Sequence, residues 1–216
     1  MRIVLEAKIE RADGTRQTVE IFALDRAPDS TPSCGIGLLL SESRELVGNL
    51  QGVVLREQAA EVVAAARQCQ HCSQLLAVKG SSAVVYRTAF GKIRLDAPRL
   101  YSRCSSCGVR VTRASSFSPL ANALPERTHP QWSWLQTRYA SAMSYKLARS
   151  FLHTSFTGAA NLPSSSVRAN VQRVGSRLEA EMQRRAEDFW AEHHDDQAVD
   201  AGAAVHALQI DAGYVR

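Results

Sequence analysis

Cys69-Gln-His-Cys72 is followed, after 31 intervening residues, by Cys104-Ser-Ser-Cys107. Each pair is a C-x-x-C turn flanked by small or polar residues. Two such turns offer four thiolates to one Zn²⁺ in tetrahedral geometry, which is the sulfur-only pattern of structural zinc sites. A thioredoxin-like redox pair and unrelated surface cysteines are the alternatives. A single C-x-x-C would leave them open, whereas two in this arrangement favour zinc.

The spacer between the two cysteine pairs is long enough to hold structure of its own. Residues 83–88 and 92–100 are two β-rich runs, interrupted at Phe90-Gly91. The pattern predicts a β-hairpin carried between two knuckles, which makes residues 69–118 a zinc ribbon. Lys92 and Arg94 alternate with Ile93 and Leu95, so the basic side chains are expected to face outward while the apolar ones pack. Arg87, Arg99 and Arg103 extend this positive surface.

Length and composition are those of an ordinary globular chain. Of 216 residues, 45% are hydrophobic and 22% are charged, which is compatible with one or two domains. The sequence contains no apolar run near the ~20 residues of a membrane span, and it begins on a strand-like pattern rather than a signal peptide. We therefore expect a cytoplasmic, nucleoid-associated protein, where reduced thiols favour metal over disulfides. Cys34 has no partner at metal spacing and is interpreted as a buried or incidental thiol.

Charge is unevenly distributed along the chain, although its net value is only +5. Residues 1–68 have a net charge of −2, and residues 187–216 have −6. Residues 69–186 carry 17 Lys and Arg against 4 Asp and Glu, a net +13. Such a concentration of positive charge is expected of a protein that binds a phosphate backbone. A merely solvated basic face is the alternative, but it would not need this many charges.

The N-terminal part, residues 1–68, is predicted to be a β-hairpin followed by a helix. Residues 2–9 and 17–24 alternate around Asp13-Gly14, a hairpin turn in which both residues are expected at positive φ. From Ser41 the apolar spacing becomes helical and continues to about Arg67, weakened locally by Gly48 and Gly52.

Residues 119–186 are predicted to form a helical, helix-turn-helix-like region. A first helix begins at Pro130, and its aromatic residues are spaced for a buried face rather than for stacking on bases: Trp132, Trp134, Tyr139. Ser144 is expected to cap a second helix, whose inward residues would be Leu147, Ala148, Phe151 and Leu152. The hydroxyl groups of Ser164 to Ser166 are expected to cap a third helix. The third has an apolar stripe: Val167, Val171, Val174, Leu178, Met182. Other positions present residues suited to contacting DNA: Arg168, Gln172, Arg173, Arg177. The alternative is an ordinary charged helix in an α-bundle.

The C-terminal part changes character again. Residues 187–204 are acidic and alanine-rich, and we interpret them as a linker. His193-His194-Asp195-Asp196 belongs to that linker, because adjacent residues on a solvated segment rarely converge on one ion. Residues 205–216 form an apolar strand-like run that contains Asp211, which is either a turn-former or the first carboxylate of a metal site.

Taken together in this order, these segments resemble the transposases of bacterial insertion sequences of the ISKra type. The likeness covers nearly the whole chain, from the N-terminal hairpin through the knuckles. It is carried in particular by the following stretches: Phe90-Gly-Lys-Ile-Arg-Leu, Phe117-Ser-Pro-Leu, Leu124-Pro-Glu-Arg-Thr, Met143-Ser-Tyr, Val167-Arg-Ala-Asn-Val, Ile210-Asp-Ala-Gly-Tyr-Val-Arg.

The resemblance implies a DNA-cutting and strand-joining enzyme with an RNase H-like core that uses Mg²⁺. Its N-terminal part would recognise double-stranded DNA at the terminal repeats of the element. Asp211 matches the first catalytic acid of that core. The fold expected is therefore α+β: hairpin and helix, zinc ribbon, helix-turn-helix-like region, and the first strand of an incomplete RNase H-like core.

The sequence stops five residues after Asp211, so we expect this chain alone to be catalytically inactive. It is the DNA-binding portion of a truncated transposase in this interpretation, and a second copy of the chain is a candidate partner. A stand-alone zinc-ribbon regulator without catalysis is the alternative, and the nucleotide sequence after codon 216 would separate the two. A zinc-stabilised protein-interaction scaffold is a third, weaker interpretation.

Overall fold

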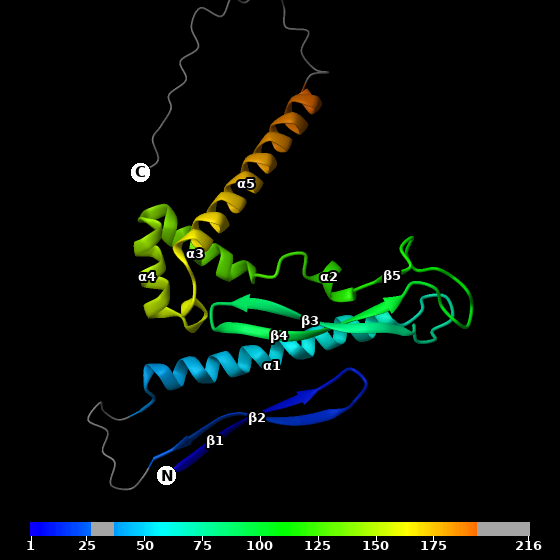
Figure 1. The fold of residues 1–216 in the computed structure, drawn as a ribbon, viewed down its shortest axis with the longest axis horizontal. Coiled ribbons are helices and arrows are strands. Elements are labelled where there is room, and N and C mark those ends of the chain that lie inside the picture. Colours follow the sequence, from blue (N-terminus) through cyan, green and yellow to red (C-terminus); the bar gives the residue numbers. More distant parts are fainter. Residues whose placement is uncertain (27–36, 194–216) are drawn as a thin grey trace, which may run out of the picture. The chain divides into compact units, whose positions relative to one another are not determined.

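The structure is a computed structural model that describes residues 1–26 and 37–193. The predictions for Cys34, for the strand 205–216 and for Asp211 lie outside the described residues. The elements follow in chain order (Figure 1): β1 (Arg2–Glu10), β2 (Arg16–Asp25), α1 (Leu40–Arg67), β3 (Val78–Thr88), β4 (Gly91–Tyr101), β5 (Ser116–Phe117), α2 (Pro119–Ala123), α3 (Pro130–Ala142), α4 (Tyr145–Ser155), η1 (Thr157–Ala159), α5 (Ser164–His193).

The α+β class is confirmed, with two small antiparallel sheets in strand orders β1-β2 and β3-β4-β5. The chain forms two compact units, Met1–Val171 and Gln172–Arg216. The first unit therefore includes the hairpin, the ribbon and the helical region up to the beginning of α5. The expected boundaries after residues 68 and 118 lie inside this first unit. Helix α1, which precedes the ribbon in the sequence, and α2, which follows it, both pack on the ribbon.

The N-terminal hairpin forms as predicted, but its turn differs. Gly14 alone has positive φ, +82°, and Asp13 does not. The connection spans residues 11–15, with the Gly14 N–H donating to the Arg11 carbonyl at 2.9 Å. The Asp13 carboxylate accepts from the Thr15 hydroxyl at 2.7 Å and from the Thr15 N–H at 2.9 Å. These bonds hold the pKa of Asp13 below its usual value. The contacts of the Asp13 side chain with Thr15 stabilise this longer turn, which forms in place of the expected two-residue turn.

Helix α1 is tied to the hairpin at two points. Near its beginning, the Glu42 carboxylate accepts from the Leu39 N–H and from the Arg26 guanidinium, both at 2.7 Å. Further along, Arg11 donates two bonds to Glu57, at 2.7 and 2.9 Å. The helix ends at Arg67 and leads directly into Cys69, as the sequence predicts.

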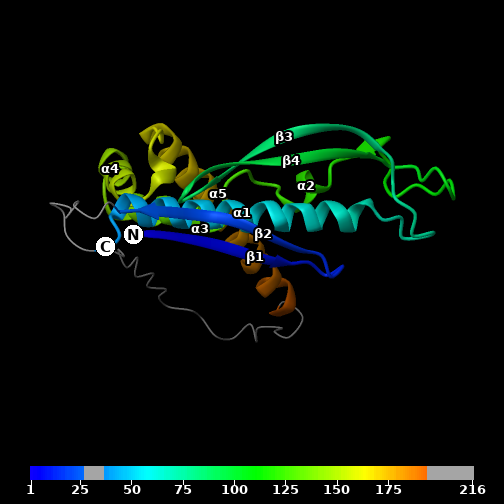
Figure 2. The same ribbon diagram turned by 90° about the horizontal axis from the view of Figure 1, so that it is seen from below.

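The β3–β4 ribbon is the sheet against which the other elements of the first unit pack. Burial alternates along β4, where Ile93, Leu95 and Ala97 are buried. These side chains form one core cluster with Ala59 of α1 and Leu120 of α2. Both helices cover the same face of the ribbon, and no described element of the first unit covers the other face (Figure 2).

The turn between β3 and β4 is approached closely by two glycines. A Cβ at Gly48 would lie 3.3 Å from the Phe90 carbonyl oxygen, so this glycine allows α1 to contact the turn. A Cβ at Gly158 would lie 2.7 Å from the Ala89 oxygen and would overlap the Thr88 oxygen. The Gly158 N–H also donates to the Ala89 carbonyl at 2.8 Å. The turn is therefore docked into the helical region by backbone contact.

The helical region has its own core around Trp132. Trp132, Leu152, Ala159 and Val167 are buried together, so α3, α4, η1 and the first turns of α5 share one cluster. A buried polar contact adds to it: the Ser133 hydroxyl donates to the Asn170 side chain at 2.6 Å. Paired in this way, two buried polar groups avoid the cost of desolvation without a partner.

The predicted inward faces of these helices are partly wrong. Trp134 is 57% exposed, because it lies two residues from buried Trp132 and hence on the opposite side of α3. The guanidinium carbon of Arg138 lies 5.4 Å from the centroid of the Trp134 ring. Leu147 and Phe151 are about half exposed, whereas Ala148 and Leu152 are buried. Ser144 caps α4 as predicted, accepting from the Leu147 N–H at 3.4 Å.

The described part of the second unit is helical, residues 172–193 of α5. The predicted acidic linker from residue 187 is thus helical up to His193, since alanine and glutamate favour helix. Within the apolar stripe, Leu178 and Met182 are 58% and 70% exposed rather than buried. Among the helices that the structure describes, none is long and apolar enough to cross a membrane.

Candidate metal centre

The first cysteine knuckle is a tight turn that follows α1. The Cys69 N–H donates to the Gln74 carbonyl at 2.9 Å, and the Ser73 N–H donates to the Cys69 carbonyl at 2.8 Å. Ser73 has φ +59°, and it is the one non-glycine residue of the described chain at positive φ. The left-handed conformation of Ser73 turns the chain back after Cys72, so that Gln74 can accept the bond from the Cys69 N–H.

The second knuckle repeats the first, position for position, 35 residues later. The Cys104 N–H donates to the Val109 carbonyl at 2.9 Å, and the Gly108 N–H donates to the Cys104 carbonyl at 3.0 Å. Gly108 has φ +71° and occupies the place of Ser73. Each knuckle is closed by an antiparallel bridge, Gln68 with Leu75 and Arg103 with Arg110.

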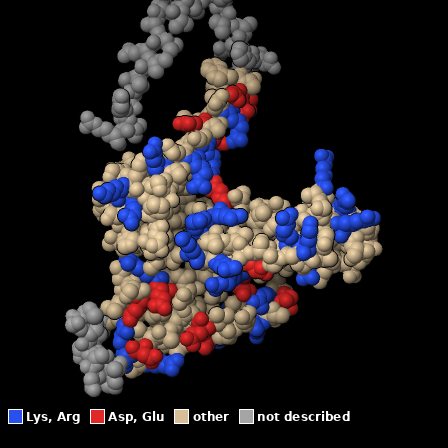
Figure 3. All heavy atoms as spheres, viewed as in Figure 1, with Lys and Arg blue, Asp and Glu red and all other residues tan. Residues whose placement is uncertain are grey.

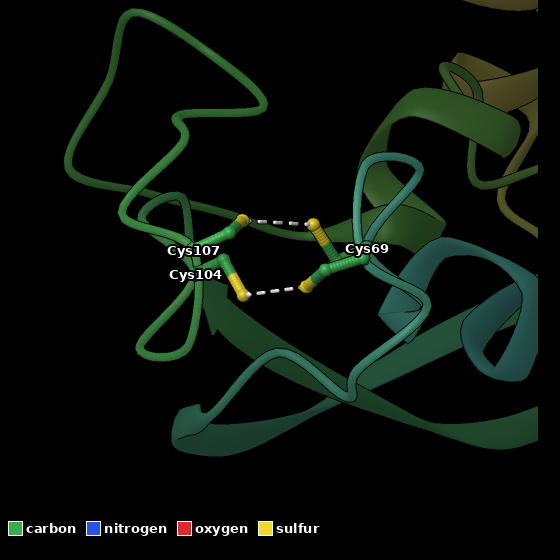
Figure 4. Close-up of side chains that lie close together, drawn as sticks. Cys69, Cys104 and Cys107 are labelled. Carbon is green, nitrogen blue, oxygen red and sulfur yellow. Dashed lines mark hydrogen bonds between the residues drawn. The ribbon is translucent and has the colours of Figure 1, made fainter.

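The four sulfurs of Cys69, Cys72, Cys104 and Cys107 all lie within 4.8 Å of one another. Across the two knuckles, the Sγ atoms of Cys69 and Cys107 are 3.8 Å apart, and those of Cys72 and Cys104 are 3.6 Å apart (Figure 4). A tetrahedral ion with metal–sulfur bonds of ~2.3 Å needs sulfurs about 3.8 Å apart. These four cysteines could therefore hold one metal ion such as zinc.

The same distances bear on the redox alternative. All four cysteines are free thiols, and a disulfide requires sulfurs about 2.05 Å apart. The close sulfur pairs join one knuckle to the other rather than the two cysteines of a single C-x-x-C. This arrangement suits one shared ion and not a redox-active pair within one motif.

Backbone N–H groups prepare the first cysteine of each knuckle to be a thiolate. Bonds from the N–H groups of Cys107 and Ser106 lower the pKa of Cys104 to about 6. Equivalent bonds from Cys72 and His71 lower the pKa of Cys69. Thiolate is the form that binds metal, so the backbone favours the ligand form of Cys69 and Cys104.

The second cysteine of the first knuckle behaves differently. The Gln74 N–H lowers the pKa of Cys72, but burial and hydrogen bonds to the other three thiols outweigh it and raise this pKa to about 12. Four sulfurs at this distance cannot all be charged without a cation. The raised pKa of Cys72 thus reflects the same crowding that a divalent ion would relieve.

The core beneath the sulfurs is small. Its buried members are Cys69, Leu76, Leu100 and Cys104, so half of them are candidate ligands. Leu75 on the same end of the ribbon is 60% exposed. Two leucines and the partly buried Phe117 supply little surface to hold this end closed by apolar packing alone.

The basic residues predicted on the ribbon, Lys92 and Arg94, are exposed on β4. The register adds a detail that strand alternation alone does not give: Arg87 lies directly opposite Lys92, and Val85 opposite Arg94. Arg87 is also exposed. Within the described chain, none of these three cations forms an ion pair.

The predicted residues of the third helix lie on α5. Arg168, in the first unit, is exposed, and so are Gln172, Arg173 and Arg177 in the second unit. Eight residues separate α4 from α5, which is longer than the usual turn of a helix-turn-helix motif. The small or polar residues that flank each C-x-x-C were predicted to let a tight turn form, and two of them, Ser73 and Gly108, have the positive φ that each turn uses.

Comparison of the chain with protein-family models, with curated proteins and with solved structures gave no match.

Proposed function

We propose that this chain is a DNA-binding protein in which one structural zinc ion holds a basic β-ribbon rigid. The proposal includes its origin as the end-recognising portion of an insertion-sequence transposase of the ISKra type. That assignment rests on the resemblance of the sequence segments. The DNA-binding part rests in addition on the distribution of charge over the fold.

The observation that carries the proposal is the uncovered face of the ribbon. It presents Arg87, Lys92 and Arg94 together, with Arg87 directly opposite Lys92. Like charges directly opposite one another on a sheet destabilise it. A fold that keeps such a pair unneutralised gains nothing in stability from it, whereas a phosphate backbone would neutralise all three charges.

Further cations surround the metal end of the ribbon. Five exposed basic residues lie on β3, on β4 or around the second knuckle: Lys79, Arg99, Arg103, Arg110, Arg113. On the face drawn in Figure 3, Lys and Arg predominate at this end, whereas Asp and Glu gather where β1, β2 and α1 lie. The segregation supports a surface that binds an anion as long as the ribbon.

Zinc has a structural role in this proposal. All four coordination positions would be filled by cysteine sulfur, and a closed site of this kind leaves no position for a substrate or water. The ion would join the end of α1 to the end of β4. It would thereby fix the ribbon whose charges contact DNA.

Titration of a fluorescent DNA duplex with the full chain at several salt concentrations tests the proposal. Binding should weaken steeply with salt, because released counterions favour the complex at low salt. Replacing Arg87, Lys92 and Arg94 by Ala should reduce the salt slope by about 0.9 for each phosphate that is no longer neutralised. Salt-insensitive binding, or no binding at all, would contradict the proposal.

A matched control uses arginines of the acidic part. Arg2 and Arg16 are exposed but lie beside Asp25 and Glu10, at 3.9 and 2.8 Å. Their replacement by Ala should leave the salt slope unchanged. For α5, Arg168→Ala combined with Arg173→Ala should reduce affinity more than Arg110→Ala. The reverse order would remove α5 from the proposed DNA-contacting surface.

A further inference from the structure

Residues 172–193 of α5 present an apolar stripe that remains exposed. Val174 is half-buried, and Leu178 and Met182 are 58% and 70% exposed. Phe189 follows at 53%. The spacing of these residues places them on one side of the helix. An exposed apolar stripe on a long helix marks an interaction surface.

Charge along α5 changes sign near the middle of the helix. Residues 168–177 carry three Arg and no acidic residue, whereas residues 179–192 carry five acidic residues and two Arg. If a second copy of α5 ran in the opposite direction, the basic half of each helix would lie beside the acidic half of the other. A parallel copy would oppose like to like. The charge pattern therefore favours an antiparallel second copy over a parallel one.

The same conclusion follows from one flank of the stripe. Arg177, Glu181 and Asp188 lie along this flank, in the order basic, acidic, acidic. A two-fold axis perpendicular to the helices keeps each flank on its own side but reverses its direction. With the axis near residue 180, Arg177 meets Glu181 of the second copy, and Glu181 meets its Arg177.

We propose that α5 pairs with α5 of a second copy of this chain in an antiparallel arrangement. Leu178 packs against Met182 of the second copy, and the arginines of one basic half lie along the acidic half of the other. Glu181 already pairs with Arg184 and with Arg185 of its own helix, the second at 2.8 Å. One carboxylate accepts several bonds, so these contacts are compatible with the pairing. Arg168 and Gln172 lie on the other flank and remain open to nucleic acid.

The mass of the full chain in solution, measured by sedimentation equilibrium over a range of concentrations, tests the pairing. A dimer is expected. Leu178→Glu with Met182→Glu should raise its dissociation constant roughly 100-fold or more, because four apolar side chains leave the interface of the symmetric pair. Ser176→Glu with Ala180→Glu adds the same charge on the opposite side of α5 and should leave the constant unchanged.

A charge exchange tests the direction of the helices. Arg177→Glu and Glu181→Arg should each weaken self-association, since each places like charges together. A mixture of the two variants should form a heterodimer at least about 10-fold tighter than either homodimer. Far-ultraviolet circular dichroism would confirm that α5 is still helical in each variant.

Three results would overturn the proposal. A monomer at all concentrations would mean that another segment of the chain or a different protein covers the stripe. A dimer unaffected by Leu178→Glu with Met182→Glu would place the interface elsewhere. A mixture no tighter than its homodimers would exclude the antiparallel direction. None of these measurements involves DNA, so this proposal can fail while the proposed DNA binding stands.

Discussion

The two ends of the β3–β4 ribbon are held in place by different means. At the turn, Gly158 contacts the backbone of Thr88 and Ala89, and Phe90 lies beside Phe156, with ring centroids 6.4 Å apart. At the opposite end, the two knuckles bring four sulfurs together over a small core of two leucines and the partly buried Phe117. Close packing of backbone and aromatic rings holds the turn end, whereas the opposite end carries the four cysteines that are the candidate metal ligands.

This difference shows how a small sheet can be rigid along its whole length without a large core. Packing is sufficient where two helical segments reach the ribbon, because each supplies apolar surface and hydrogen bonds. Where the chain supplies little apolar surface, a metal ion held by the four cysteines would replace the missing core. The two ends should therefore respond separately to perturbation.

Removal of the metal should have the largest effect, and it should be confined to one end. Purified protein is expected to contain about one zinc per chain, and a strong chelator should open the knuckles, since such sites contribute on the order of 10 kcal/mol. Hydrogen exchange measured by mass spectrometry should accelerate in residues 68–76 and 101–112. Residues 86–93 and 130–160 should keep their protection, and uniform loss across the ribbon would contradict separate ends.

Loss of a single sulfur should reproduce the effect of the chelator. Cys72→Ser is expected to lower zinc content and to destabilise the metal end, because three sulfurs cannot complete the tetrahedral site. Cys34→Ser is the matched control and should retain full zinc content. If Cys72→Ser left both zinc content and stability unchanged, the four-thiolate site would be wrong.

Gly158→Ala should break the opposite end. The added methyl group would collide with the carbonyl oxygens of Thr88 and Ala89, and we expect a loss of about 3 kcal/mol in the free energy of unfolding. Zinc content should be unaffected. Gly175→Ala serves as control because no atom lies within 4 Å of a Cβ there. It should stabilise α5 slightly, and equal losses in the two variants would dismiss the docking contact.

Within the metal end, the fifth residue of each knuckle provides the smallest test. Gly108→Ala places a side chain in the left-handed region and should cost about 1–2 kcal/mol. Ser73→Gly makes the reciprocal change and should add up to about 1 kcal/mol, reduced by the greater freedom of glycine in the unfolded chain. Competition with a zinc-binding dye would report both changes. Equal signs for the two substitutions would show that the knuckles are not equivalent.

The sequence predicted the parts of this fold that depend on local spacing. The knuckles, the hairpin between them and the helix from Ser41 to Arg67 follow from residue types a few positions apart. Trp134 was predicted inside and is exposed, because apolar character does not reveal which side of a helix meets a partner. No local pattern predicts that Gly158 contacts Thr88, since the two residues are 70 positions apart.

For the candidate site, too, some features follow from local spacing in the sequence and others depend on the whole fold. The four ligands could be identified from C-x-x-C spacing alone, and the outward direction of Lys92 and Arg94 follows from strand alternation. That Arg87 faces Lys92 depends on the register, which is set by the turn at Ala89-Phe90. No local pattern could show that Leu178 and Met182 remain exposed, because burial depends on what the rest of the chain supplies.

The close repetition of the knuckle backbone has a consequence for how this protein can vary. The hydrogen bonds shared by the two turns use main-chain atoms, and they constrain the cysteines and the residue that follows them. The two residues between the cysteines, Gln70-His71 and Ser105-Ser106, are exposed, and their side chains have no part in that scaffold. The residues at these two tips can therefore be exchanged without disturbing the backbone geometry that gathers the four sulfurs.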